Sequence, residues 1–392
     1  MPHTRNRHII ELIAKKTSFS PVVAIQGARQ TGKSFIGREL LPKGQPQLHY
    51  LTLDEKPFRL AAQNSPDDFL SRFPDAKPLV IDEVQKSPDL FDAIKLSVDK
   101  NRVPGKFIIL GSTEFSRLTH IRESLTGRMS RVRVFPFNLS ESLSLDPNSS
   151  KKFDRLNQRP RIRREELHTY LERGGLPGLF AIRSSLERDQ ALTDLIDLIL
   201  FRDARFSKWF DAELGRDILE QIARLSLPNL AEISSILRVD ARRIKRHLEV
   251  LKELFVIHSL EPHRLGFGKS IFFLYDCALA KFLGASHLRV LQTWLLNEQL
   301  SQRTYQGEIH WKMNTYFTQK GSQIDFLIEN PSEILAIKIL DESKIRKTDI
   351  LILKKLAEKA PSAPKLRLIV LAPISESYKE DGIEFFPFEA VV

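Results

Sequence analysis

Hydrophobic residues in the first 140 positions come in short runs that end in polar turns, and stretches with helical spacing separate these runs. The runs cover residues 21–26, 48–53, 78–82, 106–110 and 131–135. Short apolar runs that alternate with helical patterns indicate parallel strands buried on both faces. We therefore predict an α/β domain with a parallel sheet over residues 1–145.

Beyond residue 145 the pattern changes more than once. A polar, basic connector and a helical segment occupy residues 146–215. Residues 216–285 show three short helical patterns, followed by a pair of alternating runs at 256–260 and 271–275. Residues 286–392 return to mixed strands and helices. A chain of 392 residues holds two or three domains at about 150 residues each, in agreement with this division.

Composition and hydropathy argue against a membrane protein. Hydrophobic residues make up 42% of the chain, and no apolar run reaches the roughly 18 residues that a membrane span needs. The first residues lack the apolar stretch of a secretory signal, so we expect a cytoplasmic protein with no membrane partner. Cys277, the single cysteine, lies in an apolar stretch and is predicted to be buried.

The charge balance favours an anionic partner. Lys and Arg number 60 against 49 Asp and Glu, which gives a formal net charge of +11. Positive charge attracts polyanions at long range and releases their counterions on binding. DNA is therefore a candidate partner, provided that the charge gathers on a suitable element.

A phosphate loop follows the first apolar run. Its residues are Gly27, Ala28, Arg29, Gln30, Thr31, Gly32, Lys33 and Ser34, in the pattern G-x-x-x-x-G-K-[ST]. Glycines let backbone N–H groups turn toward an anion, and the lysine reaches the outer phosphates. Ser34 is predicted to ligate Mg²⁺. The expected cofactors are ATP and Mg²⁺.

Two later apolar runs end in residues suited to phosphate chemistry. Asp82 and Glu83 end the run at 79–83, and adjacent side chains on a strand point in different directions. We expect Asp82 to hold Mg²⁺ through water and Glu83 to polarise the attacking water. Ser112 or Thr113, at the end of the run at 108–113, is expected to contact the γ-phosphate or the water.

An arginine is a candidate for completing the site of a neighbouring subunit. Arg128 precedes the last apolar run of the first domain, and an arginine supplied in trans stabilises charge on the transferred phosphoryl group. Arg122, Arg131 and Arg133 are alternatives. Such a role predicts a homo-oligomer.

These motifs together resemble the prokaryotic AAA-type ATPases that carry a carboxy-terminal DUF4143 region. The resemblance rests on the phosphate loop and on residues 81–88, 110–113, 125–128, 135–141, 174–177 and 201–203, with Lys269, Tyr275 and Asp276. It implies an additional-strand P-loop core over residues 1–145 and a helical segment over 146–215. It further implies a winged helix over 216–285 and a domain similar to PD-(D/E)xK nucleases over 286–392.

The third helical pattern of the implied winged helix is basic. Apolar residues recur at helical spacing from 240 to 255, while Arg242, Arg243, Lys245 and Arg246 lie outside the apolar stripe. A buried stripe with a basic amino-terminal half suits a recognition helix. Arg264 and Lys269 would add phosphate contacts from the wing. The alternative is a winged helix that docks protein.

The implied nuclease lacks one of its acids. Asp325 and Lys338 fit the pattern, but Ala336 stands where the acid before the lysine belongs. Glu298 resembles the supporting acid of the family and, with Asp325 alone, makes a poor metal site. We therefore expect no nuclease activity and a domain retained for docking DNA or protein.

The sequence thus predicts a Mg²⁺-dependent ATPase that acts on DNA in repair, recombination or defence. The alternative is an ATP-switched regulator or scaffold whose winged helix docks protein.

Overall fold

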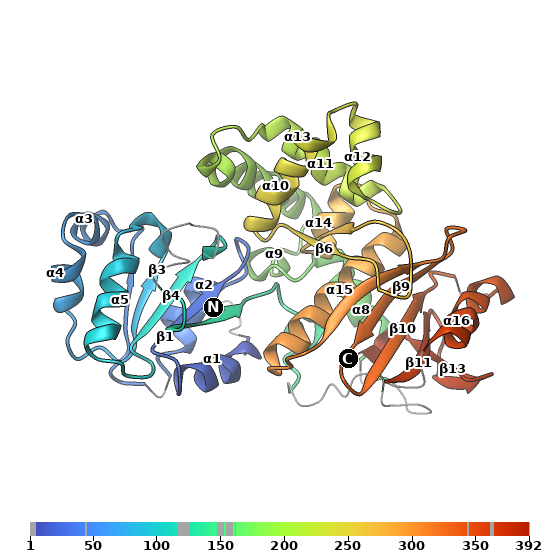
Figure 1. Ribbon diagram of the computed structural model, residues 1–392, viewed down its shortest axis with the longest axis horizontal. Coiled ribbons are helices and arrows are strands. Elements are labelled where there is room, and N and C mark those ends of the chain that lie inside the picture. The colour runs from blue at the N-terminus through green and yellow to red at the C-terminus, as the bar shows by residue number, and fades with distance from the viewer. Residues whose placement is uncertain are drawn as a thin grey trace.

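A computed structural model describes residues 5–43, 45–115, 125–146, 153, 160, 162–342, 345–360 and 364–391. Figure 1 shows three parts: an α/β domain that contains β1 and α5, a helical domain around α11 to α13, and a second α/β domain around α15 and β10. Within the described residues, no helix is both long and apolar enough to cross a membrane.

The first domain is built on a parallel sheet of five strands in the order β2-β3-β4-β1-β5. The strands are β1 (Val22–Gln26), β2 (His49–Thr52), β3 (Leu79–Asp82), β4 (Phe107–Gly111) and β5 (Met129–Arg133). This confirms the predicted parallel sheet. The last strand begins two residues earlier than predicted, within the usual uncertainty of strand ends.

Helices cover both faces of this sheet. One face packs against α3 (Lys56–Asn64), α4 (Pro66–Ser71) and α5 (Leu90–Lys100). The other face packs against α1 (Ile9–Thr17) and the helix after the phosphate loop. That helix starts as α2 (Lys33–Phe35) and continues as a π-helical turn, Ile36–Leu40.

Most helices of the helical domain pack around one hydrophobic core, whereas Leu167, Tyr170 and Leu171 of its first helix pack with the carboxy-terminal domain. The helices of the helical domain are α8 (Arg164–Arg173), α9 (Pro177–Phe180), α10 (Ser185–Asp197), α11 (Ala212–Arg224), α12 (Leu230–Leu237), α13 (Ala241–Glu253) and α14 (Cys277–Phe282). A π-helical turn (Leu198–Arg202) and a 3₁₀ turn (Asp203–Phe206) follow α10, and a hairpin of β6 (Ile257–Leu260) and β7 (Ile271–Leu274) follows α13. The core runs from Leu176 to Leu283, so the domain boundary predicted between residues 215 and 216 falls inside it.

The carboxy-terminal domain is a mixed sheet packed on a long helix, α15 (His287–Tyr305). Its six strands run in the order β12-β13-β11-β10-β9-β8. They are β8 (Lys312–Phe317), β9 (Gln323–Glu329), β10 (Glu333–Ile339), β11 (Lys365–Ala372), β12 (Tyr378–Glu380) and β13 (Ile383–Pro387), with α16 (Lys347–Lys359) between β10 and β11. β8, β9 and β10 are antiparallel neighbours, whereas β10, β11 and β13 run parallel.

The segment between β6 and β7, predicted as a wing, is attached to this second sheet. Phe267 forms a bridge with Phe317 of β8, and Arg264 pairs with Glu329 of β9 at 2.8 Å. Cys277 is buried as predicted, and burial raises the pKa of its thiol well above the ordinary value.

A phosphate-loop site at the carboxyl edge of the first sheet

The loop after β1 has the backbone that its glycines predict. A Cβ at Gly27 would lie 2.2 Å from the carbonyl oxygen of Val134, so only glycine fits beside β5. Gly32 has a φ of 88°, in the left-handed region. The loop therefore curls over the end of β1 and enters α2 at Lys33.

Lys33 is buried inside this loop. Its Nζ donates to the carbonyl oxygens of Gly27 at 2.9 Å and Ala28 at 2.7 Å. Burial lowers the pKa of Lys33 to about 8, against the opposing charges of Glu83 and Asp82. The ammonium is therefore charged at neutral pH and lies where the loop would meet phosphate.

Tyr50 of β2 joins the two residues predicted to hold Mg²⁺. Its hydroxyl donates to Asp82 Oδ2 at 2.8 Å and also hydrogen-bonds with the Ser34 hydroxyl. Burial and the Asp82 charge raise the pKa of the Tyr50 phenol, so it remains a donor. Ser34 and Asp82 thus converge on one point with a hydroxyl and a carboxylate, the oxygen donors that Mg²⁺ prefers.

Glu83 stands beside Asp82 in a strained backbone conformation, with a φ of 55°. Gln85 Nε2 donates to Glu83 Oε2 and lies 3.4 Å from the Ser112 hydroxyl. Burial raises the pKa of Glu83, as does the charge of Asp82, while Lys33 lowers it. Glu83 is therefore a fixed carboxylate with increased basicity.

The two hydroxyl candidates on the loop after β4 differ in their contacts. Ser112 is buried and meets Gln85, whereas Thr113 accepts a bond from Gln26 Nε2 at its carbonyl oxygen, 2.8 Å away. Among the described residues, the buried atoms Thr113 Oγ1 and Gln85 Oε1 have no hydrogen-bond partner. The structure therefore brings Ser112, more than Thr113, to the Glu83 side of the site.

The helical domain contacts the phosphate loop directly. Arg29 forms a two-pronged ion pair with Asp203, in which Nη2 lies 2.6 Å from Oδ1. The Pro177 ring lies 3.6 Å from the position of a Cβ on Gly32. Arg29, predicted to touch the nucleotide, is thus held by a carboxylate that the chain supplies 174 residues later.

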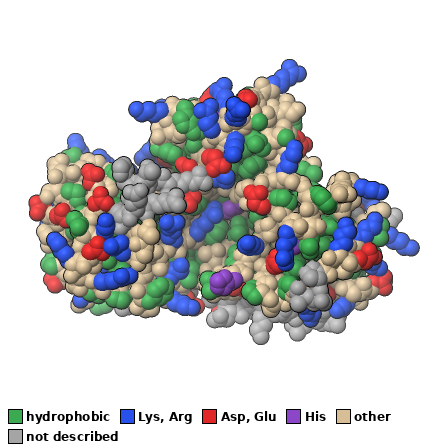
Figure 2. Space-filling model, in the orientation of Figure 1, with side chains coloured by type: hydrophobic (Ala, Val, Ile, Leu, Met, Phe, Trp, Pro, Cys, Tyr) green, Lys and Arg blue, Asp and Glu red, His purple; other side chains and the backbone are tan. Residues whose placement is uncertain are grey.

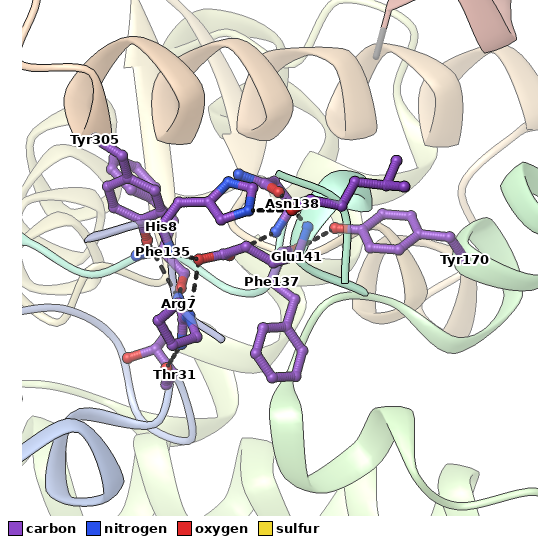
Figure 3. Close-up of polar contacts among 10 residues, drawn as sticks. Arg7, His8, Thr31, Phe135, Phe137, Asn138, Glu141, Tyr170 and Tyr305 are labelled. Atoms are coloured by element: carbon purple, nitrogen blue, oxygen red, sulfur yellow. Dashed lines mark hydrogen bonds and ion pairs between the residues drawn. The ribbon is translucent and has the colours of Figure 1, made fainter. Parts of the chain in front are cut away.

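Arg7 also holds the phosphate loop in place (Figure 3). Its guanidinium donates to the carbonyl oxygens of Thr31 at 2.6 Å and Phe135 at 2.8 Å, and to Glu141 Oε1 at 3.0 Å. Burial disfavours the charge of Arg7, but Glu141 and Tyr305 raise its pKa above the ordinary value. The guanidinium therefore fixes the loop to the segment that leaves β5.

The carboxy-terminal domain takes part in the same network. The Tyr305 hydroxyl, at the end of α15, accepts from Arg7 Nη2 at 3.2 Å and from the Phe135 N–H at 2.9 Å. Glu141 also closes a capping box with Asn138 at the start of α7 (Leu139–Ser142). Arg7, near the amino terminus, and Tyr305, at the end of α15, therefore hold the phosphate loop together, as Figure 3 shows.

The arginines predicted to act in trans are not part of this chain's own site. Arg128 precedes β5 at the opposite edge of the sheet and pairs with Asp99 at 2.6 Å. Arg131 is exposed and Arg133 is half-buried, whereas Arg122 lies outside the described residues. A role of Arg128 in a second subunit stays a prediction.

The five residues predicted to contact DNA lie on the helical domain. They are Arg242, Arg243, Lys245, Arg246 and Lys269, and all are exposed. Figure 2 shows Lys and Arg side chains gathered over α13 at the top of the molecule. Lys245 and Lys269 line a common groove of about 520 Å³, so the structure places Lys269 near α13.

Neighbouring side chains hold two of these arginines. Asp240 caps α13, accepting from the N–H groups of residues 242 and 243. Arg243 pairs with Asp211 at 2.8 Å, and the Arg246 guanidinium lies over the Trp209 ring, 5.1 Å from its centre. The basic face of α13 is therefore partly ordered by the segment before α11.

The residues predicted to form a nuclease-like site make hydrogen bonds and an ion pair with other parts of this chain. Asp325 accepts from Gln292 and from the Ile339 N–H, both at 2.7 Å, and lies 3.5 Å from Lys338. Glu298 accepts from the Leu139 N–H at 2.8 Å. Glu298 follows Gln292 by six residues, about 9 Å along α15. Its carboxylate therefore serves the domain junction, not Asp325.

Comparison with protein families divides the chain in a similar way. Residues 19–143 match the AAA domain family. Residues 19–143 are an AAA-type P-loop domain. Residues 164–285 match a domain of unknown function, DUF8612, so the DUF4143 region implied by the motifs is not shown. This single match covers both the helical segment and the predicted winged helix, whose apolar residues also share one core.

Two curated relatives match part of this chain. Uncharacterized proteins of Mycobacterium bovis and Mycobacterium tuberculosis are 30% identical over 254 residues, 64% of this chain and 52% of theirs. The chain thus spans about half the length of the curated relatives it matches.

Two solved structures have some similarity to this chain. A Walker-type ATPase of Pyrococcus abyssi is 16% identical with a TM-score of 0.45, covering 72% of this chain and 98% of that one. The RuvB Holliday junction branch migration motor of Thermotoga maritima is 15% identical with a TM-score of 0.32, covering 64% and 93%.

Three residues of the AAA-type site escaped prediction: Arg7, Tyr50 and Gln85. Gln85 stands two positions after Glu83, inside a motif on which the family resemblance rests, so the sequence could have indicated it as a site residue. Tyr50 meets Asp82 only because β2 pairs with β3. Arg7 meets Thr31 only through tertiary folding, and no local pattern marks it.

Proposed function

We propose that this chain hydrolyses ATP with Mg²⁺ at the phosphate loop of its AAA-type domain. The observation that carries the proposal is the convergence of Lys33, the Ser34–Tyr50–Asp82 cluster and Glu83 at one edge of the sheet. A charged lysine, two oxygen donors for a cation and a basic carboxylate are the parts that phosphoryl transfer to water requires.

Each residue has a separate task in this reaction. Lys33 exchanges the loop carbonyls for oxygens of the outer phosphates. Ser34 and Asp82 would hold Mg²⁺, which supplies positive charge to the phosphate oxygens. Glu83 takes a proton from water as the water oxygen bonds to the γ-phosphorus and the bond to ADP breaks. Gln85 orients Glu83, and its unpartnered Oε1 can accept from the same water.

The test is release of phosphate from ATP by the purified chain, compared with Lys33→Ala and Glu83→Gln. We expect Lys33→Ala to weaken nucleotide binding, and Glu83→Gln to retain binding while lowering kcat by roughly a hundredfold or more. Glu39→Gln, at an exposed position on the helix after the loop, is the matched control and should hydrolyse normally. Equal activity of Glu83→Gln and the control would refute the proposed role of Glu83.

A second candidate function is DNA binding through α13, as a winged helix. Arg242 is exposed on α13, and the exposed Lys245 and Lys269 line one groove, which supports this function. Basic side chains on an exposed helix can neutralise phosphates in a groove. The competing function is a switch that docks protein on the same face.

Stimulation of hydrolysis separates these two functions. We expect ATP turnover to rise when duplex, single-stranded or branched DNA is added, with the strongest form identifying the preferred substrate. Turnover that is indifferent to every DNA form would favour the protein switch.

A further inference from the structure

A cavity of about 540 Å³ lies between β5, the β6–β7 hairpin and α15. Its polar lining residues include Gln26, Glu114, Arg131, Arg133, Lys252 and Ser259. Figure 2 shows a hollow between the AAA-type domain and the rest of the molecule, with Lys and Arg side chains on its walls. The volume lies within the usual range for sites of small ligands.

The polar sheet residues of this cavity lie on the face opposite the helix that follows the phosphate loop, and Val132 lines its edge. Val132 and Val134 pack with Ile36 of that helix. Since side chains alternate along a strand, Arg131 and Arg133 point to the face that α5 covers. Gln26, the register partner of Arg133 on β1, shares that face. None of the predicted nucleotide-binding residues lines the cavity.

Arg133 is the central cation of this cavity. Its guanidinium is 4.8 Å from the centre of the Phe135 ring and 4.9 Å from that of Phe255. Among the described residues, no carboxylate lies within 4 Å of its nitrogens. Burial lowers the pKa of Arg133 to about 10, opposed by Glu114, so it stays charged at neutral pH.

His258 fixes one side of this guanidinium without neutralising it. Arg133 Nη2 lies 3.3 Å from His258 Nδ1, and His258 Nε2 lies 3.0 Å from Asn297 Oδ1. A neutral ring that donates from Nε2 and accepts at Nδ1 satisfies both contacts. Burial lowers the pKa of His258 well below the ordinary value, in agreement with that neutral form.

We propose that this cavity binds a phosphate-bearing ligand of about nucleotide size, with Arg133 as its principal anion contact. The planar guanidinium can bind two phosphate oxygens at once, and the exposed Arg131 adds positive charge at the rim. Two aromatic rings and a neutral histidine hold Arg133 in place, so its remaining donors are oriented before a ligand arrives.

The test uses inorganic pyrophosphate as the probe and the full chain with its phosphate loop filled by ADP. Isothermal titration should show one further equivalent of pyrophosphate. Arg133→Met keeps the packing between the rings and should weaken this second binding by roughly tenfold or more. Arg163→Met, at the exposed arginine that precedes α8 and does not line the cavity, should leave it unchanged.

The same titration on Lys33→Ala, without ADP, distinguishes this cavity from the phosphate loop. Because the variant changes only the loop, pyrophosphate should still bind in the cavity. If Arg133→Met does not fold, Arg131→Met at the exposed rim replaces it, with an expected weakening of severalfold. Absence of a second equivalent, or binding that neither variant changes, would overturn the proposal.

Competition identifies the source of the phosphate. Displacement of pyrophosphate by a short oligothymidylate, lost in Arg133→Met, would assign the site to a polynucleotide backbone. Retention of pyrophosphate in the presence of the oligonucleotide would assign it to a free phosphorylated molecule.

Discussion

At the scale of single residues, the chemistry of the site depends on how Lys33 is held. Its ammonium is buried and donates to the carbonyl oxygens of Gly27 and Ala28. Burial lowers the pKa to about 8, so a modest rise in pH removes the charge. Bound phosphates stabilise the charged form and raise that pKa again.

This difference predicts a pH-dependent affinity for nucleotide. The free protein loses the Lys33 proton near pH 8, whereas the complex retains it to higher pH. Affinity for ADP should therefore fall by up to about tenfold per pH unit above pH 8 and stay level below it. Equilibrium binding between pH 7 and 9.5 measures this.

Lys33→Ala is the control for that dependence. Any weak binding that it retains should lack the decline above pH 8. A level affinity in the unchanged protein up to pH 9.5 would contradict the assignment of Lys33 as the titrating phosphate ligand.

At the scale of elements, α13 combines a buried stripe with an exposed basic face. Ile244, Leu248 and Leu251 are buried, while Arg242 and Lys245 are exposed and make no ion pair with the described residues. The apolar spacing of the sequence predicted this division, because 3.6 residues per turn fix which side chains share a face.

Charge reversal on that face tests the second candidate function. Arg242→Glu with Lys245→Glu should weaken DNA binding and reduce the slope of log affinity against log salt by about two, since each neutralised phosphate contributes about 0.9. Fluorescence anisotropy at several salt concentrations measures the slope.

Lys355→Glu with Lys359→Glu, on the exposed face of α16, changes the charge equally and should leave the slope as it was. The same slope in both double variants would mean that α13 does not contact the polymer.

At the scale of the whole molecule, all three domains meet at the phosphate loop. The helical domain supplies Asp203 to Arg29, and the carboxy-terminal domain supplies Tyr305 to Arg7, which holds the Thr31 carbonyl. Events at the loop are therefore physically connected to both later domains.

Tyr305→Phe tests that connection. The change leaves the Phe135 N–H without its acceptor and Arg7 with one contact fewer. We expect the free energy of unfolding to fall by about 1–2 kcal/mol and the affinity for ADP to fall severalfold. Urea denaturation and equilibrium binding measure the two effects.

Tyr378→Phe, on the exposed strand β12, is the matched control and should change neither quantity. Loss of stability in Tyr305→Phe with unchanged ADP affinity would show that Tyr305 joins the domains without positioning the loop.

The sequence by itself determined the parallel sheet, the phosphate loop, the buried stripe of α13 and the acids after β3. These features depend on local periodicity and on residue types at fixed spacing, which operate within a few turns or one strand. The helix Ala241–Glu253 lies where the apolar spacing over residues 240–255 predicted it.

Only the tertiary structure decided which distant groups complete the site. Tyr50 reaches Asp82 through strand pairing, and Arg7 reaches Thr31 because the amino-terminal segment packs against the phosphate loop. Apolar residues on both sides of the boundary predicted at residue 215 share one core, because α10 and α11 bury their apolar faces together. Such contacts depend on how elements pack in space, and the spacing of residues along the chain does not specify that packing.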